Sequence, residues 1–283
     1  MPVSIEPPPV VVGTAEPAPS ISAHGAPAAA PPDVQRRTVT ASFTTDLIGS
    51  IQSLMGTIVI AIFVITFIVQ AFQIPSESME KTLLVGDYLL VNKLCYGGSG
   101  FGDTLMPYQK IQRKDIIVFH YPVDPTQHFV KRVIGLPGDR LKMVNKKVYI
   151  DGKLIDEPYV RFIEPPNNLF RDDFPRVDVP VFNMEGKWWL QMRKLVEDGE
   201  LIIPQGNYFV MGDNRDDSQD SRYWGFVPQE NIIGRPLVIY WSIEEWDKGY
   251  QPASINGRLE HLFYSMTHFF QLTRWHRTLR LVH

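Results

Sequence analysis

The chain has 283 residues, of which 44% are hydrophobic and 21% charged, so most of it can fold around an apolar core. Its 28 basic and 31 acidic side chains give a net charge of -3, and without a basic excess the composition does not indicate a nucleic-acid-binding protein. Cys95 is the single cysteine, which excludes an intrachain disulfide and a cysteine-based metal site.

The N-terminal segment is rich in proline and alanine, with runs such as Pro7-Pro8-Pro9 and Ala28-Ala29-Ala30-Pro31-Pro32. Such a segment cannot bury enough apolar surface to offset the entropy lost on ordering. We therefore expect residues 1–45 to form a disordered arm.

A long apolar stretch follows, with no charged residue between Leu47 and Pro75. Its densest part, Leu54–Phe72, would rise about 28 Å as a helix, close to the hydrocarbon thickness of a bilayer. We predict an uncleaved transmembrane anchor over residues 47–74. A cleavable signal peptide is the alternative because Val69-Gln70-Ala71 has the small-residue pattern of a cleavage site, but the apolar run is longer than usual for one. The flanking positive charges do not decide the orientation.

Short strand-like runs separated by turn signals come after the anchor. They are Asp87–Val91, Asp115–Phe119, Phe129–Ile134, Arg140–Ile150, Asn207–Met211 and Pro236–Trp241. Leu136-Pro137-Gly138-Asp139 predicts a turn, and Asn145-Lys146 predicts the loop of a hairpin. We expect a mostly β domain over residues 75–253, with an inserted β-rich subdomain at about 159–203.

Two serines lie directly after the predicted anchor. Pro75 favours an extended chain, so Ser76 and Ser78 should point the same way. Adjacent hydroxyls suit a nucleophile and an oxyanion donor. An isolated Ser-x-Ser is, however, more often an ordinary linker turn.

Two cations, Lys131 and Arg132, interrupt an apolar strand pattern. The alternation of side chains between the two faces of a strand does not say which of the two cations is buried. Arginine stays protonated in proteins, whereas a desolvated lysine can lose its proton and become a base. A free lysine is neutral only about 0.04% of the time at pH 7, so a base needs a pKa lowered by roughly 3 units, or about 4 kcal/mol against the charged form. The alternative is a lysine that reaches out to water.

The third unusual segment, residues 212–228, is densely charged between apolar flanks. A solvated acidic loop is the simplest interpretation. Asp213, Asp217 and Asp220 could supply oxygens to calcium, but their spacing is not that of an EF-hand. His120 and His128 lie nearest these motifs, although nothing marks either as the base of a Ser/His mechanism.

Together these segments resemble bacterial type I signal peptidases, the leader peptidases with a Ser/Lys dyad that remove signal sequences from exported proteins. The matching residues are Phe72-Gln73-Ile74-Pro75-Ser76-x-Ser78-Met79, Gly86-Asp87, Asp115–Phe119, Lys131-Arg132, Gly135–Asp139, and Gly212–Asp216 through Pro228. The resemblance covers about residues 45–245 in the same order. Each piece alone is weak, and the combination is highly specific.

The resemblance implies a signal-peptidase-like β-fold in which Ser78 is the nucleophile and Lys131 the general base. Ser76 Oγ and the Ser78 backbone N–H would hold the oxyanion, and Ser218 would hydrogen-bond and orient Lys131. The loop would be braced by Asp220 and Arg222. The substrate pockets, which accept small side chains at the first and third residues before the cut, would be lined by Ile74, Pro75, Leu83, Phe129 and Val130.

The resemblance also implies that no cofactor or metal is needed. It places the chain in the bacterial inner membrane as a single-pass protein, with the arm in the cytoplasm and the catalytic domain on the periplasmic side. The implied partners are signal sequences of exported preproteins, the lipid bilayer and the secretion translocon, with no nucleic acid. Self-cleaving Ser/Lys repressor peptidases, which are soluble, and a catalytically silent binding protein of the same fold are the alternatives.

Three positions depart from the family pattern: Glu77 and Lys114 stand where glycine is usual, and Lys81 where proline is common. The tail, residues 254–283, also lies outside the pattern. Apolar residues between Leu259 and Phe270 have the spacing of an amphipathic helix, and a basic, aromatic cluster follows. We expect this tail either to lie in the lipid headgroup region or to pack on the β domain.

Overall fold

The computed structural model describes residues 40–96, 109–164, 169–178, 183–244 and 267–282. The predicted disordered arm therefore lies almost wholly outside the described residues. Most of the predicted amphipathic stripe of the tail lies outside them as well.

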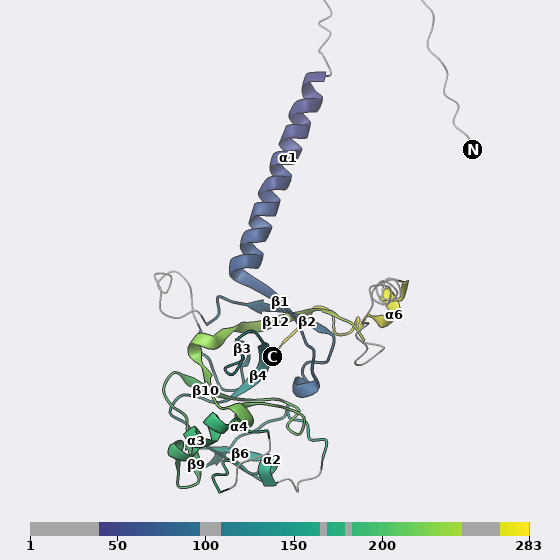
Figure 1. Cartoon of the computed structure of the whole chain (residues 1–283). Coiled ribbons are helices and arrows are strands. Elements are labelled where there is room, and N and C mark those ends of the chain that lie inside the picture. Colours follow the sequence, from purple (N-terminus) through teal and green to yellow (C-terminus); the bar gives the residue numbers. More distant parts are fainter. Residues whose placement is uncertain (1–39, 97–108, 165–168, 179–182, 245–266, 283) are drawn as a thin grey trace, which may run out of the picture. The chain divides into compact units, whose positions relative to one another are not determined.

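The apolar stretch forms helix α1 (Thr40–Phe63), which continues as a π-helical turn, η1 (Val64–Ile68) (Figure 1). Residues 47–68 are long and apolar enough to cross a membrane, and none of this span is buried. Side chains such as Leu54 and Ile60 are 60% and 65% exposed. Within the described part of the chain these apolar side chains are not covered, which is compatible with a segment that spans a bilayer.

The predicted anchor over residues 47–74 extends too far. The last five residues before Ile74 form strand β1 (Val69–Gln73), which pairs antiparallel with β2 (Asp87–Asn92) in a register that joins Val69 to Asn92. A short apolar run suits a helix end and a strand equally well, so the sequence pattern could not separate them. The partner strand decides, because it supplies the backbone hydrogen bonds.

The first sheet has eight strands in the order β1-β2-β12-β3-β4-β10-β11, with β13 paired to β12. Beyond β1 and β2 its strands are β3 (Ile116–His120), β4 (His128–Gly135), β10 (Asn207–Met211), β11 (Val227–Pro228), β12 (Ile232–Ser242) and β13 (Arg280–Leu281). All of its pairings are antiparallel. The predicted strands of this sheet are confirmed to within one or two residues, except that Pro236–Trp241 is part of the longer β12.

The second sheet has the order β7-β6-β5-β9-β8. Its strands are β5 (Arg140–Val144), β6 (Lys147–Ile150), β7 (Lys153–Leu154), β8 (Val196–Glu197) and β9 (Glu200–Ile202). Asn145 and Lys146 form the predicted hairpin loop, and their φ angles of 48° and 66° are those of a type I′ turn.

This sheet begins at Arg140, earlier than the expected start of the inserted subdomain at about 159. Between 159 and 195 the described elements are helices, α2 (Leu169–Asp172) and α3 (Gly186–Leu195), rather than strands. The second sheet includes residues from Arg140 onward because β5 pairs with β9, with Leu141 opposite Leu201. Trp188 and Met192 of α3 are buried in the core of this sheet.

The described part of the tail packs on the first sheet. Helix α6 (Phe269–Leu272) comes before strand β13 in the chain. Strand β13 pairs with β12, with Leu281 opposite Val238. The Arg277 guanidinium is buried against Asp87, with Nη2 2.5 Å from Oδ2. Of the two expectations for the tail, packing on the β domain therefore holds for residues 273–282.

Candidate active site

The serine segment is held by buried apolar side chains and by backbone hydrogen bonds. The Ile74 N–H donates to the Asp87 carbonyl at 2.9 Å, and the Gly86 N–H donates to the Ile74 carbonyl at 3.0 Å. Met79 and Leu83 are fully buried in the core beside Ile74. The chain between these fixed points turns through the short 3-10 helix η2 (Glu77–Met79), which carries Ser78.

Ser76 and Ser78 lie next to each other as expected, with their Oγ atoms 3.3 Å apart. Ser76 is extended whereas Ser78 is already in the 3-10 turn. This geometry leaves the Ser78 hydroxyl in contact with two polar groups, one of which is Ser76.

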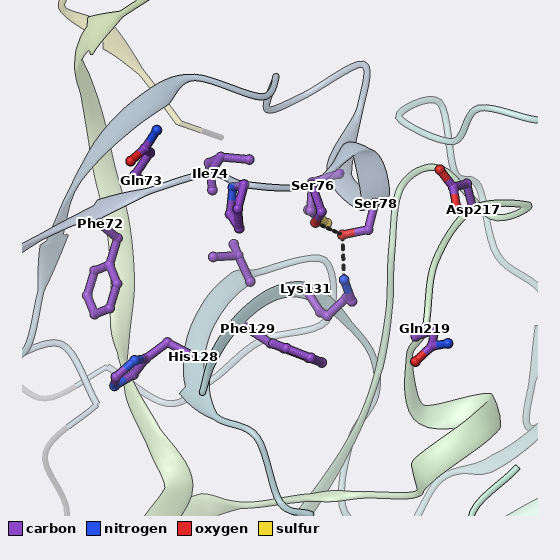
Figure 2. Close-up of a pocket in the computed structure, with 13 residues that line it drawn as sticks. Phe72, Gln73, Ile74, Ser76, Ser78, His128, Phe129, Lys131, Asp217 and Gln219 are labelled. Carbon is purple, nitrogen blue, oxygen red and sulfur yellow. Dashed lines mark hydrogen bonds between the residues drawn. The ribbon is translucent and has the colours of Figure 1, made fainter. Parts of the chain in front are cut away.

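The second group is Lys131 of β4, whose Nζ lies 2.5 Å from Ser78 Oγ (Figure 2). Lys131 is only 4% exposed, and its Nζ lies 5.6 Å from the centroid of the Phe129 ring. Among the described residues no carboxylate forms an ion pair with this amine. Lys131 is thus a buried lysine with an apolar wall and a hydroxyl partner.

Burial lowers the pKa of Lys131 to about 8, because an apolar site disfavours the charged amine. The negative charges of Asp220 and Asp213 act in the opposite direction but do not cancel this effect. At a pKa of about 8, roughly a tenth of the molecules carry a neutral Lys131 at pH 7. A free lysine is neutral several hundred times less often, so this site converts the residue into a usable base.

Arg132 is equally buried but serves a different purpose. Its Nε and Nη2 donate to the two carboxylate oxygens of Asp213 at 2.8 and 2.7 Å. The Thr82 hydroxyl donates to the same carboxylate at 2.5 Å, and the guanidinium stacks 4.0 Å above the Tyr159 ring. Arg132 is thus a neutralised structural cation. Sequence reasoning missed its partner because the two residues are 81 positions apart.

The charged loop after β10 is built on a second buried ion pair. Asp220 accepts hydrogen bonds from Arg222 Nε and Nη2, both at 2.8 Å, and from the Gly212 N–H at 3.1 Å. The Asn214 N–H donates to the Ser78 carbonyl at 3.1 Å, which ties the loop to the serine segment. Asp213 and Asp220 are each occupied by an arginine, and no metal-binding cluster occurs among the described residues.

Ser218 does not make the expected hydrogen bond to Lys131. Its Oγ is buried and has no hydrogen-bond partner among the described residues. The side chain lies against Gly212, where a Cβ atom would collide with both Ser218 and the Ser78 carbonyl. Lys131 instead directs its amine to Ser78.

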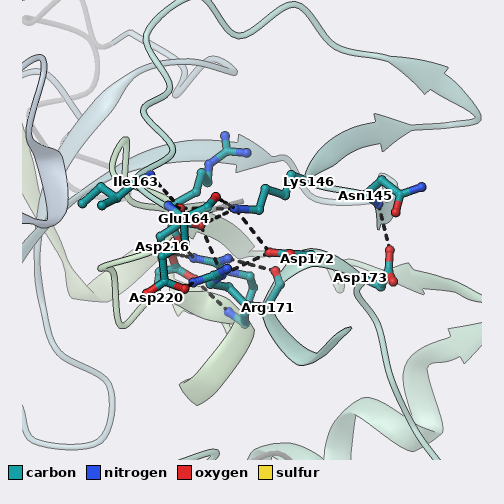
Figure 3. A network of polar contacts seen from close by, with 11 residues as sticks. Asn145, Lys146, Ile163, Glu164, Arg171, Asp172, Asp173, Asp216 and Asp220 are labelled. Carbon is teal, nitrogen blue, oxygen red and sulfur yellow. Dashed lines mark hydrogen bonds and ion pairs between the residues drawn. The ribbon is translucent and has the colours of Figure 1, made fainter. Parts of the chain in front are cut away.

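A charged network anchors the same loop to the second sheet (Figure 3). Lys146, in the turn between β5 and β6, donates to Asp216 at 2.9 Å and to the Glu164 carbonyl at 2.7 Å. Asp216 also accepts the N–H groups of Ile163 and Glu164. Burial raises the pKa of Asp216, but these hydrogen bonds outweigh burial and hold the pKa below its ordinary value. The loop is therefore held both to the serine segment, through Asn214, and to the second sheet, through Asp216.

A cavity of ≈ 310 Å³ opens beside the two serines and Lys131. Four of the five predicted substrate-contacting residues line it: Ile74, Pro75, Phe129 and Val130. Leu83 is not among the lining residues, because it is fully buried in the core beneath the serine segment. The other lining residues, which sequence reasoning did not single out as a pocket wall, are Phe72, Gln73, Met79, His128, Asp217 and Gln219.

The histidines do not act on Ser78 in this structure. The His128 ring faces Phe72 at the far end of the cavity, with ring centroids 5.4 Å apart (Figure 2). The centroid of the His120 ring lies 4.8 Å from that of His128. The His120 Nδ1 atom contacts the Pro125 carbonyl. The hydroxyl of Ser78 contacts Lys131 and Ser76 instead.

Comparison with known proteins shows the family of the chain. The family described as "Signal peptidase, peptidase S26" matches residues 47–241. The chain belongs to this family. It is therefore a serine peptidase with a mostly β fold, and the predicted resemblance is confirmed.

Among relatives, a signal peptidase I of Pseudomonas fluorescens is 37% identical over 193 residues, which cover 64% of this chain and 67% of that protein. A signal peptidase I of Aquifex aeolicus is 38% identical over 216 residues, covering 65% and 80%. A solved signal peptidase I of Enterococcus faecalis is 34% identical and covers 45% of this chain and 97% of that chain, with a TM-score of 0.33. The tail from residue 242 onward lies outside the family match.

Proposed function

We propose that this chain is a membrane-anchored signal peptidase that removes N-terminal signal peptides from exported preproteins. The observation that carries the proposal is the 2.5 Å contact between the buried Lys131 Nζ and Ser78 Oγ at the wall of a cavity. It joins a hydroxyl nucleophile to a base whose pKa burial has lowered to about 8. The names of the relatives supply the class of substrate.

In the proposed reaction the neutral amine of Lys131 accepts the proton of the Ser78 hydroxyl as Oγ attacks the carbonyl carbon of the scissile bond. The ammonium then passes that proton to the leaving amine, so that a serine ester remains. Lys131 next takes a proton from water as the water oxygen attacks the ester carbonyl carbon. The ammonium then returns that proton to Ser78 Oγ as the ester bond breaks, which releases the new carboxyl terminus and regenerates the serine. Because no carboxylate among the described residues forms an ion pair with Lys131, the amine can return to the neutral form between steps.

The oxyanion of the tetrahedral intermediate needs donors beside Ser78 Oγ. The Ser76 hydroxyl, 3.3 Å from that atom, and the Ser78 backbone N–H are our candidates. The ion pair between Asp220 and Arg222 would hold the loop that lies against the Ser78 carbonyl. Ser218 lies in the same loop, where it packs on Gly212.

The cavity supports a preference for small side chains at the first and third residues before the cut. We propose that at least two substrate positions share its ≈ 310 Å³ volume. Buried neighbours such as Ile74 and Met79 cannot move aside without disturbing the core. A large aromatic side chain would therefore strain the site.

The exposed apolar helix supports a single-pass anchor. We propose that the N-terminal arm is cytoplasmic and the catalytic domain periplasmic, since exported preproteins present their cleavage sites on that side. Signal sequences and the bilayer would then be direct partners, and the secretion translocon a neighbour.

The test uses the purified chain in non-ionic detergent with a synthetic signal-sequence peptide, and the cut is mapped by mass spectrometry. Ser78→Ala and Lys131→Ala should each abolish cleavage, while His120→Ala and His128→Ala retain it. The wild-type kcat/KM should rise about fivefold from pH 7 to pH 8, as Lys131 with a pKa of about 8 deprotonates.

Peptides with alanine and phenylalanine just before the cut should differ by at least tenfold in kcat/KM. Dead histidine variants with an active Lys131→Ala would contradict the mechanism. Equal turnover of the two peptides would contradict the specificity.

A further inference from the structure

A second cavity, of ≈ 500 Å³, is lined by an unusual concentration of positive charge. We name it the cationic pocket; its basic residues are Lys81, Arg113, Lys114, Arg132, Arg235 and Arg280. Asp115 is the one acidic residue among those that line it. The chain as a whole has a net charge of -3, so this local excess does not reflect a basic protein.

Some of these cations are already paired with carboxylates. Arg132 binds Asp213 at 2.7 Å, and Arg113 binds Asp139 at 2.8 Å. Arg235 lies 3.5 Å from Asp115.

The other three cations have no carboxylate partner among the described residues. Lys114 and Arg280 are exposed. Lys81 donates to the backbone carbonyls of Pro158 and Val160, which are uncharged. Like charges gathered in a concave site repel one another and raise the local potential for an anion. The cationic pocket thus has about three positive charges left to neutralise.

Both lysines of the pocket have a backbone conformation that is unfavourable for a residue with a side chain. The φ angles of Lys81 and Lys114 are 99° and 78°, in the region that glycine adopts freely and other residues rarely adopt. Arg280 comes from the tail beyond residues 47–241, the part of the chain that the family model matches. The unpaired charge of the pocket therefore comes from two lysines held at an unfavourable φ angle and from an arginine of the tail.

We propose that the cationic pocket binds a phosphate-bearing anion through Lys114 and Arg280. A phosphate monoester or diphosphate carries two or more negative charges, which suits three unpaired cations. Its oxygens match both the fork of an arginine and the point charge of a lysine. The volume admits such a group, whether it is a free anion or the headgroup of an anionic lipid.

The test is isothermal titration calorimetry on the full chain in non-ionic detergent at low salt. One arm uses inorganic pyrophosphate, and the other uses dihexanoyl phosphatidic acid with dihexanoyl phosphatidylcholine as its uncharged-headgroup control. The variants are Lys114→Gly and Arg280→Gln, singly and together. Glycine suits the φ angle at position 114 and keeps the backbone carbonyl that accepts from Arg132 Nη1 at 2.8 Å. The matched control is Lys153→Gln, which removes an exposed cation on the second sheet.

We expect saturable binding in at least one arm, weakened about tenfold by each pocket variant and unchanged in Lys153→Gln. Binding of pyrophosphate would identify a site for free phosphates, and binding of the lipid alone would identify a headgroup site. No binding in either arm, or equal loss in the control, would overturn the proposal. Because the measurement needs no turnover, its result is independent of the proposed peptidase function.

Discussion

Replacement of Lys131 by methionine should abolish cleavage and yet make the protein more stable at neutral pH. Methionine has a similar length and no charge, so it removes the base while it fills the same buried site. The pKa of Lys131 is lowered from 10.5 to about 8, so holding the charged form in the folded protein costs about 3 kcal/mol. Loss of the contact with Ser78 offsets about 1 kcal/mol of the gain, which leaves a net increase of about 2 kcal/mol.

The pH dependence of this gain has a definite sign. Below pH 8 the lysine is protonated in both states, and the full cost is present. Between pH 8 and 10.5 the unfolded chain still binds the proton while the folded protein has released it. Wild-type stability therefore rises with pH in that window, and the advantage of Lys131→Met shrinks.

Urea denaturation followed by tryptophan fluorescence, in detergent at pH 6, 7, 8 and 9.5, measures this difference. Lys153→Met is the control, because that side chain is exposed and its replacement should change little at any pH. A variant at Lys131 that is less stable than wild type at pH 6, or a difference that does not vary with pH, would refute the account of a desolvated lysine.

Three further changes test the surrounding structure. Ser76→Ala should lower kcat by about 10²–10³ with little change in KM, because it removes an oxyanion donor; an unchanged kcat would exclude Ser76 from that role. Gly212→Ala should lower kcat at least 100-fold, since the added Cβ would displace the Ser78 carbonyl. Full activity would show that the loop can shift to accommodate the methyl group without moving Ser78. Arg277→Ala should destabilise the domain by roughly 3–5 kcal/mol in the same urea assay, because it leaves Asp87 buried and short of a partner. A loss below 1 kcal/mol would mean that Arg274, whose Nη2 lies 4.0 Å from Asp87, compensates.

Local features of the chain could be predicted from the sequence because a few neighbouring residues decide them. A charge-free run of sufficient length predicts a long apolar helix, and residues 47–68 form one. Two residues between alternating strands, such as Asn145-Lys146, fix a hairpin through their own φ angles. The serine pair after Pro75 and the unusual lysine in a strand were visible for the same reason.

The tertiary structure alone decided which residues meet. Lys131 and its neighbour Arg132 look alike in the sequence, and only the register of β4 sends the first to Ser78, 53 residues away, and the second to Asp213. The same holds for the end of the predicted anchor, where pairing with β2 made a strand, and for Ser218, which packs on Gly212 instead of reaching Lys131. These contacts form between segments far apart in the chain, so their free energy depends on the whole packed domain and leaves no local pattern.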